Sequence, residues 1–312
     1  MGQERNKLKM KEEKKFKSGF VSVIGRTNVG KSTLVNALVG EKVAAVANKT
    51  QTTRTAIKGI VNRPNAQIIF IDTPGIHKPR TKLNETMIET AFTFAKDVDI
   101  ILFVIDATSE EIGRGDRKIL DKIKEAKTKT ILLLNKIDMV QNKEKLLHLI
   151  DVYRKEYHFT AVIPISASKK QNLEEVLDEI EKNLKEGPAY YDIEEYTDQT
   201  LRQLAEEMIR EKALKFLDDE VPHGLYVEVE KMKLRKTKEK EEIYDVEATI
   251  YCLRESHKGI IIGKNGSMLK KIGTYARQEL ERMLETKINL KLWVKVKEDW
   301  QNKENIVHKF KV

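Results

Sequence analysis

Residues 25–32 read Gly-Arg-Thr-Asn-Val-Gly-Lys-Ser, between the apolar run 20–24 and a run at 33–38 with helical character. A strand, then Gly-x-x-x-x-Gly-Lys-Ser, then a helix is the expected setting of a loop that binds phosphate groups. The glycines let backbone N–H groups turn toward a polyphosphate, and the helix directs its positive end at the same charge. We expect Lys31 to reach the outer phosphates and Ser32 to ligate Mg²⁺. A plain glycine-bearing loop with a surface lysine is the competing interpretation, which the flanking strand and helix disfavour.

A second motif, Asp72-Thr73-Pro74-Gly75, follows the short apolar run Ile68–Ile71. In P-loop proteins an aspartate at this place holds Mg²⁺, and the glycine N–H contacts the γ-phosphate. The same four residues also form a good turn, because Pro and Gly favour turns. Their position after a buried-looking strand and downstream of the phosphate loop favours the metal role.

Guanine recognition is predicted from Asn135–Asp138, Asn-Lys-Ile-Asp, which follows the apolar run 131–134. A carboxylate at Asp138 can accept hydrogen bonds from guanine N1–H and the exocyclic amine, whereas adenine offers no such pair of donors. We expect Asn135 to contact guanine O6 or N7 and to tie loops together, and the Lys136 stem to cover the base. Ser166-Ala167 resembles the loop whose alanine N–H contacts guanine O6. The motifs together favour GTP over ATP.

Composition and length suit two domains in a reducing compartment. The chain has 312 residues, and no apolar run approaches the ~18 residues needed to span a bilayer. We expect no secretory leader, because no apolar centre follows the basic N-terminus. The single cysteine, Cys252, excludes an internal disulfide framework and fits the cytoplasm.

Charge and periodicity divide the chain into five parts. We predict a flexible basic arm at 1–17, a GTP-binding domain at 18–187, an acidic linker at 188–199, an RNA-binding domain at 200–305 and a tail at 306–312. Apolar runs at 100–105 and 131–134 indicate an α/β fold with a doubly wound, mostly parallel sheet. Residues 221–312 carry 20 basic against 14 acidic side chains, which suits a polyanionic partner, although ordinary solvated lysines explain it equally well.

The C-terminal part has the element order α-β-β-α-α-β of a smaller, α+β type II KH domain. Gly263-Lys264-Asn265-Gly266 lies between its two later helices. These glycines let the loop approach a nucleic-acid backbone, and the adjoining groove holds about four single-stranded nucleotides. A plain helix–turn–helix connection is the alternative. The predicted RNA-binding residues are Arg254, Lys258, Gly259, Ile262, Gly263, Lys264, Asn265, Gly266, Lys270 and Lys271.

With both parts in view, the chain resembles the Era family of bacterial GTPases over about residues 18–305. The resemblance rests on 25–32, Gln51-Thr52-Thr53-Arg54, 72–75, 135–138, 166–167 and 263–266, in that order. It departs at Thr27, where the family commonly has proline, and in its longer Lys-rich N-terminus. The resemblance implies a monomer that binds GTP and GDP, grips the single-stranded 3′ end of 16S rRNA and assists assembly of the small (30S) ribosomal subunit. It also implies a cytoplasmic protein with peripheral contact at the cytoplasmic face of the cell membrane.

On this resemblance, a threonine between the first helix and the Asp72 strand completes the Mg²⁺ shell in the GTP state and releases it after hydrolysis. We favour Thr53 over Thr52, the alternative being a solvated Thr-rich loop. Ile76 stands where many small GTPases carry a glutamine that orients water. GTPases with Asn at the place of Asn28 and a Thr-Thr-Arg switch often bind K⁺, so we hypothesise that K⁺ accelerates hydrolysis and that Asn28 ligates it.

The sequence thus predicts three sets of residues in the nucleotide site. Catalytic roles fall to Lys31, Asn28, Thr53 and Gly75, and metal ligation to Ser32, Thr53 and Asp72. The nucleotide-binding set is Gly25, Arg26, Thr27, Asn28, Val29, Gly30, Lys31, Ser32, Thr33, Asp72, Thr73, Pro74, Gly75, Ile76, Asn135, Lys136, Ile137, Asp138, Ser166 and Ala167.

We interpret the chain as a GTP-hydrolysing, RNA-binding switch. Two alternatives from other classes stay open: a non-enzymatic RNA chaperone in which nucleotide only stabilises the fold, and a signalling GTPase whose C-terminal domain binds protein. A steep fall of affinity with salt distinguishes RNA binding from protein binding, because phosphate contacts release counterions.

Overall fold

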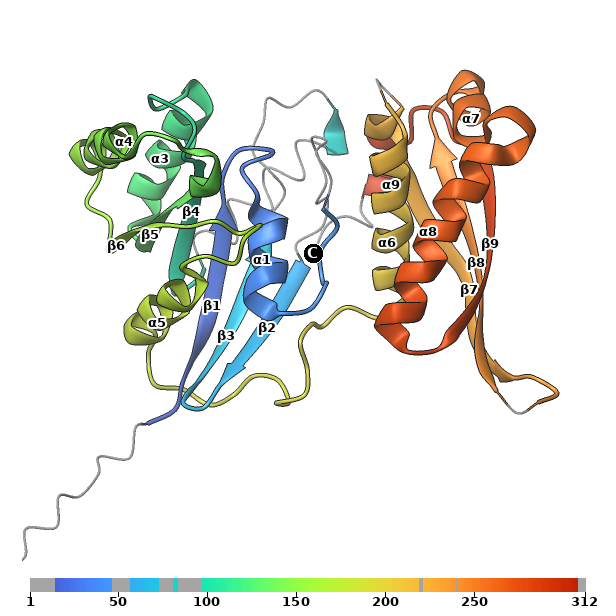
Figure 1. Cartoon of the computed structure of the whole chain (residues 1–312), viewed down its shortest axis with the longest axis horizontal. Helices are drawn as coiled ribbons and strands as arrows, with labels where there is room; N and C mark the ends of the chain where they lie inside the picture. The colour runs from blue at the N-terminus through green and yellow to red at the C-terminus, as the bar shows by residue number, and fades with distance from the viewer. Residues whose placement is uncertain are drawn as a thin grey trace, which may run out of the picture.

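The computed structural model describes residues 15–46, 57–72, 81–83, 97–218, 221–239 and 241–307. Two domains lie side by side and are joined by the extended segment 184–200 (Figure 1). The predicted site residues Thr53, Thr73, Pro74, Gly75 and Ile76 lie outside the described residues.

The N-terminal domain is a six-stranded sheet with helices on both faces (Figure 1). Its strand order is β2-β3-β1-β4-β5-β6, and every neighbouring pair is parallel except β2 with β3. This is the doubly wound, mostly parallel arrangement that the apolar runs predict. Its elements are β1 (Lys17–Ile24), α1 (Lys31–Val39), β2 (Ile57–Arg63), β3 (Ala66–Asp72), β4 (Ile100–Asp106), α3 (Arg114–Ala126), β5 (Lys129–Asn135), η1 (Ile137–Met139), α4 (Lys143–Glu156), β6 (Ala161–Pro164) and α5 (Leu173–Asn183).

Side chains of the central strands alternate between two apolar cores. In β4, Ile100 and Leu102 face the core beneath α1 and α5, whereas Ile101 and Phe103 face the core beneath α3 and α4. Because both faces are covered, these strands are apolar throughout, as parallel sheets require. Parallel pairing also brings the strand ends together: Val23 is opposite Asp72, and Asp106 is opposite Asn135.

The boundaries of the N-terminal domain differ slightly from those that the charge pattern suggests. β1 begins at Lys17, the last residue of the predicted flexible arm, because its N–H donates to the Asn65 carbonyl at 3.0 Å and extends the pairing with β3. The segment 188–199 is bound to the open edge of the sheet. The Ile60 N–H donates to the Tyr196 carbonyl at 2.9 Å, and Thr197 bridges to Gly59.

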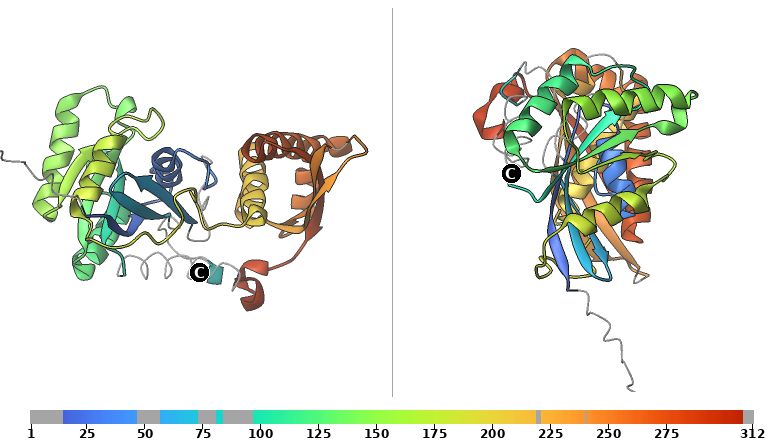
Figure 2. Two further views of the ribbon diagram at one scale, coloured as in Figure 1. Left: turned by 90° about the horizontal axis from the view of Figure 1, so that it is seen from below. Right: turned by 90° about the vertical axis from the view of Figure 1, so that its left-hand side faces the viewer.

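The C-terminal domain packs its helices on one face of a three-stranded sheet of order β7-β8-β9. α6 lies on the side that faces the N-terminal domain, and the strands lie on the far side (Figure 2). The order α-β-β-α-α-β agrees with the predicted type II KH topology, with β8 parallel to β9. The elements are α6 (Leu201–Phe216), η2 (Pro222–Gly224), β7 (Tyr226–Lys236), β8 (Glu242–Cys252), α7 (Glu255–Ile262), η3 (Lys264–Gly266), α8 (Ser267–Leu284), β9 (Lys287–Val296), η4 (Trp300–Asn302) and α9 (Glu304–Val307).

The chain after β9 is part of the folded core, and this core extends past residue 305, the predicted end of the KH domain. Trp300 is fully buried and its indole N–H donates to the Gly224 carbonyl at 2.9 Å. Ile306 and Val307 are also buried, in a cluster with Trp300 and with Leu83 of the N-terminal domain. The sequence predicts the end of the KH domain at 305, and the burial of Ile306 and Val307 extends the folded part to 307, the last described residue.

Among the described residues, no helix combines the length and apolar composition that crossing a bilayer requires.

We expect Trp300→Ala to lower the free energy of unfolding by about 3–5 kcal/mol, the usual loss when a buried tryptophan is truncated. Urea unfolding followed by circular dichroism measures this change. The matched control is Trp293→Ala on β9, because Trp293 is 42% exposed; its expected loss is about 1 kcal/mol. Equal losses for the two variants would contradict the assignment of Trp300 to the core.

Candidate nucleotide site and nucleic-acid interface

The loop between β1 and α1 has a backbone that only its glycines permit. Gly30 has φ 98°, and a Cβ there would lie 2.3 Å from Asn135 Nδ2. A Cβ on Gly25 would lie 2.4 Å from the Val104 carbonyl oxygen. Asn28 also lies in the left-handed region, at φ 64°. The loop therefore curls tightly against neighbouring strand ends, and α1 begins directly after it.

Lys31 is held inside this loop. Its side chain is buried, and its Nζ donates to the carbonyls of Gly25 at 3.1 Å and Arg26 at 2.8 Å. Burial lowers the pKa of Lys31 to about 8, and the nearby Asp72 carboxylate acts in the opposite direction. The ammonium group is thus desolvated next to the first turn of α1, whose N–H groups also favour an anion.

Asp72 and Ser32 meet the same edge of the sheet. Asp72 is the last residue of β3 and is fully buried beside the β1 strand that leads into the loop. Ser32 is the second residue of α1. The structure therefore brings a carboxylate and a hydroxyl, both oxygen donors, to the place that the motifs predict.

Asn135 links the phosphate loop to the loop after β6. Its Nδ2 donates to the Val29 carbonyl at 2.8 Å, and its Oδ1 accepts from the Ala167 N–H at 2.9 Å. Asn135 is buried, so both ends of its amide are used to join loops. The Ala167 N–H, which the resemblance directs to guanine O6, donates to Asn135 in this structure.

Asp138 lies beside these loops on the short helix η1. Its Oδ1 accepts a hydrogen bond from Ser166 Oγ at 2.5 Å, while the residue as a whole is exposed. Lys136 has φ 70°, and its Nζ forms an ion pair with Asp106 at 2.6 Å. The structure thus brings Asn135, Lys136, Asp138, Ser166 and Ala167 together, and their contacts with a base stay predictions.

Two charged contacts of this site were not predicted from the sequence. Asp106 ends β4 and orients Lys136; burial acts to raise the pKa of Asp106, but hydrogen bonds from Lys136 and Thr108 outweigh it and lower the pKa. Arg26 Nε lies 2.9 Å from Oδ2 of Asp116 on α3. The Asp116 carboxylate also accepts a hydrogen bond from Tyr153. A carboxylate at a strand end was a usable signal for Asp106, whereas Arg26 and Asp116 are 90 positions apart and share no motif.

The predicted RNA loop has the backbone of a tight, exposed connection. Gly263 has φ 71°, and a Cβ there would lie 2.8 Å from the Met268 Cβ. Asn265 and Gly266 also have positive φ, at 52° and 76°. Lys264 and Asn265 are exposed between α7 and α8, so the loop presents a cation and backbone groups to solvent.

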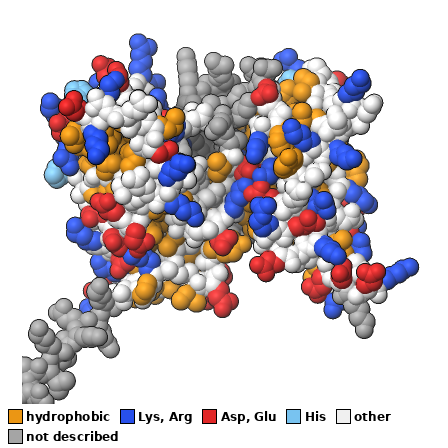
Figure 3. Space-filling model, viewed as in Figure 1, with side chains coloured by type: hydrophobic (Ala, Val, Ile, Leu, Met, Phe, Trp, Pro, Cys, Tyr) orange, Lys and Arg blue, Asp and Glu red, His pale blue; other side chains and the backbone are white. Residues whose placement is uncertain are grey.

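The other predicted RNA residues surround this loop unequally. Arg254 precedes α7 and is exposed, as are Gly259 and Lys270, whereas Lys258 is half-buried and pairs with Glu255 at 3.6 Å. Lys271 is also exposed, and its Nζ lies 4.3 Å from the centroid of the Phe216 ring on α6. Charged side chains of both signs are interspersed over the face in Figure 3, and no single basic face stands out there.

The structure has a phosphate loop at the carboxyl edge of a mostly parallel sheet, Asn-Lys-x-Asp beside that loop, and a Gly-x-x-Gly domain after the sheet. This combination defines a P-loop GTPase joined to a KH domain. Family models described as 50S ribosome-binding GTPase and KH domain match residues 20–136 and 220–301. GTPase Era of Clostridioides difficile is 52% identical over 295 residues, which is 95% of this chain and 98% of the relative. GTPase Era of Caldanaerobacter subterraneus is 52% identical over 94% of this chain and 97% of its own. The chain therefore belongs to the Era family of GTPases.

Solved structures of Era share this fold throughout. One is a complex with MgGDPNP and nucleotides 1506–1542 of 16S ribosomal RNA; it has TM-score 0.90 and 41% identity and covers 95% of this chain and 98% of its own. Another is a point variant of Aquifex aeolicus Era bound to GDP·AlF₄⁻, with the same score and identity, covering 95% of this chain and 99% of its own.

The pKa of Lys31 predicts how GTP affinity depends on pH. Below pH 8 the ammonium is already charged, so binding needs no proton; above pH 8 the free protein must take up a proton to pair Lys31 with phosphate. We expect affinity to change little between about pH 7 and pH 8, where GTP keeps its phosphate charge, and to fall by up to about tenfold per unit above pH 8. Fluorescence titration with a labelled GTP analogue measures this.

The control is Lys31→Gln, which binds more weakly but lacks this titration. Any slope that the variant retains comes from the base or from other groups. An identical slope in the two proteins above pH 8 would contradict the assignment.

Proposed function

We propose that this protein is a GTP-driven switch that binds the single-stranded 3′ end of 16S rRNA and assists assembly of the small ribosomal subunit in the cytoplasm. The proposal rests on one observation. The same chain has a tightly curled phosphate loop and an exposed Gly-x-x-Gly loop. Era, solved with MgGDPNP and a 16S rRNA segment, is 41% identical over 95% of the chain. In this proposal GTP orders the segment containing Thr53, and hydrolysis releases it.

The described residues give the nucleotide site three tasks. The buried Lys31 supplies a positive charge that a phosphate anion compensates better than two carbonyls do. The tight loop directs backbone N–H groups at the phosphates, where they stabilise charge without reorganisation. Asn135 fixes the position of the guanine-binding loops relative to the phosphate loop, and we assign base selection to Asp138.

Mg²⁺ fits the donor set of this site. Asp72 and Ser32 are hard oxygen donors, which is the chemistry that Mg²⁺ prefers, and such sites take their remaining ligands from phosphate and water. When bound, Mg²⁺ neutralises charge on the phosphates; Thr53 is the third proposed ligand.

K⁺ is the second cation that we propose. Asn28 is exposed on the phosphate loop with φ 64°, and Ile76 offers no hydrogen bond to a water molecule. We expect GTP hydrolysis to be faster in K⁺ than in a Na⁺ buffer of equal ionic strength, and Asn28→Ala to remove the difference. Phosphate release under single-turnover conditions measures both. Equal rates of the unchanged protein in the two buffers would refute the idea.

The salt dependence of RNA affinity tests the second half of the proposal. Lys264→Ala is expected to weaken binding of a 16S 3′-end oligonucleotide and to lower the slope of log affinity against log salt by about one, because one phosphate contact is lost. Lys236→Ala, at the far tip of the β7–β8 hairpin, is the matched control and keeps the slope. Fluorescence anisotropy at several salt concentrations gives both slopes, and equal slopes for the two variants would argue against the Gly263–Gly266 loop as the RNA site.

Two further features stay predictions of the family resemblance: a monomeric state and peripheral contact with the cell membrane.

A further inference from the structure

The loop between α1 and the predicted switch segment is tied to α1 on one side. Asn36 Oδ1 accepts from the N–H groups of Val43 at 3.0 Å and Ala44 at 2.8 Å, and its Nδ2 donates to the Ala44 carbonyl at 2.8 Å. α1 begins at Lys31, the lysine of the phosphate loop. The position of residues 40–46 is therefore coupled, through one helix, to the phosphate site.

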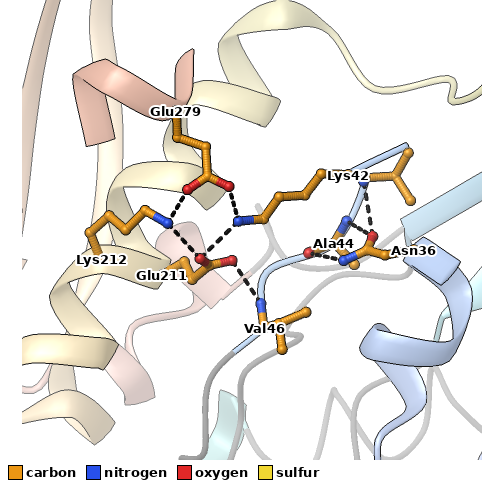
Figure 4. Close-up of polar contacts among 8 residues, drawn as sticks. Asn36, Lys42, Ala44, Val46, Glu211, Lys212 and Glu279 are labelled. Carbon is orange, nitrogen blue, oxygen red and sulfur yellow. Dashed lines mark hydrogen bonds and ion pairs between the residues drawn. The ribbon is translucent and has the colours of Figure 1, made fainter. Parts of the chain in front are cut away.

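On its other side the same loop is tied to the KH domain by a ring of four charges. Lys42 lies between Glu211 of α6, at 2.8 Å, and Glu279 of α8 (Figure 4). Lys212 contacts the same two carboxylates, Glu211 at 2.8 Å and Glu279. Two cations alternate with two anions, so removing any single member leaves a net charge in the ring.

The ring is largely shielded from water. The side chains of Glu211 and Lys212 are buried, and that of Glu279 is 18% exposed. Burial acts to lower the pKa of Lys212, but Glu211 and Glu279 outweigh it and raise the pKa. Burial acts to raise the pKa of Glu279, but Lys212 and Lys42 outweigh it and lower the pKa. Lys212 and Glu279 therefore stay charged at neutral pH, and removing a partner leaves a poorly solvated charge.

Glu211 also contacts the backbone of the loop. Its Oε2 accepts from the Val46 N–H at 2.9 Å (Figure 4). Val46 is the last described residue before 47–56, the stretch in which the sequence places Thr53. One buried carboxylate of the KH domain thus fixes both a side chain and a main-chain N–H of the loop that leads to the switch.

We propose that Glu211 and Lys42 are positioning residues through which the KH domain and the nucleotide site influence each other. An arrangement of residues 40–46 that suits one nucleotide state keeps the ring closed, and a different arrangement opens it and leaves charges uncompensated. RNA bound to the KH domain acts on the same equilibrium from the other side, since such coupling is reciprocal. The inference rests on the proposed dependence of RNA binding on GTP.

A second ion pair between the domains provides a matched control. Lys82 Nζ lies 3.0 Å from Glu304 of α9, and both side chains are mostly exposed. Exposed pairs contribute little because water and salt screen them. Glu304→Gln therefore removes a contact between the same two domains without touching the buried ring.

The experiment measures the affinity of a 16S 3′-end oligonucleotide in the presence of GDP and in the presence of a non-hydrolysable GTP analogue. The ratio used below is the higher of these two affinities divided by the lower. The test variant combines Lys42→Met with Glu211→Gln. It leaves Lys212 and Glu279 as a neutral pair, and the new side-chain amide oxygen can still accept from the Val46 N–H. We expect this ratio to fall at least about fivefold, the lower range of typical coupling. Lys42→Arg, which keeps the charge, and Glu304→Gln are expected to retain it.

The outcomes separate the inference from the proposed function. A ratio of one in the unchanged protein would refute the nucleotide dependence of RNA binding itself. A large ratio that persists in the double variant would overturn the role of the ring while the proposed function stands. Thermal unfolding is measured in parallel: a lower midpoint with an unchanged ratio means a merely structural ring and also overturns the inference. Lys42→Met alone, a change in an N-terminal-domain loop, is the second variant if the double variant does not fold.

Discussion

The structure is organised around a buried positive charge in the phosphate loop. Lys31 is desolvated within the phosphate loop and satisfied by two carbonyls, and the Asp72 carboxylate counteracts part of the cost. This arrangement requires glycine at positions 25 and 30, a fixed strand end at Asp72 and a helix that begins at once. The nucleotide site is therefore preorganised, and the reaction need not reorient dipoles as charge develops.

The helix that follows the phosphate loop, α1, also connects the nucleotide site to the KH domain. α1 runs from Lys31 to the loop that Asn36 holds, and that loop meets α6 and α8 at the ring of four charges. Communication between the domains is thus built from a few discrete contacts on rigid elements. α8 begins directly after the Gly263–Gly266 loop, so the helix that carries Glu279 is continuous with the proposed RNA site.

Much of this architecture follows from local sequence patterns. Strand ends, the phosphate loop and Asn135–Asp138 could be predicted because each lies at a carboxyl edge that parallel pairing brings together. The ring could not, because Lys42, Glu211 and Glu279 are far apart in sequence and look like ordinary surface charges. The contact of Lys271 with Phe216 could not be predicted either, because the two residues lie on different helices far apart in the sequence. The burial of Ile306 and Val307 could not be predicted either, because too few apolar residues surround them to form a pattern.

The connecting segment has a mechanical consequence. Gln67 accepts from the N–H groups of Tyr190 and Tyr191, Tyr196 accepts from Ile60, and Lys58 pairs with Asp198 at 2.8 Å. Gln199 Nε2 then donates to the Val43 carbonyl at 2.8 Å. The connecting segment thus lies along the open edge of the sheet and prevents that edge from pairing with other chains. Only Thr200 lies between Gln199 and α6. A rotation of the KH domain relative to the sheet must therefore occur near Thr200, and it displaces Val43.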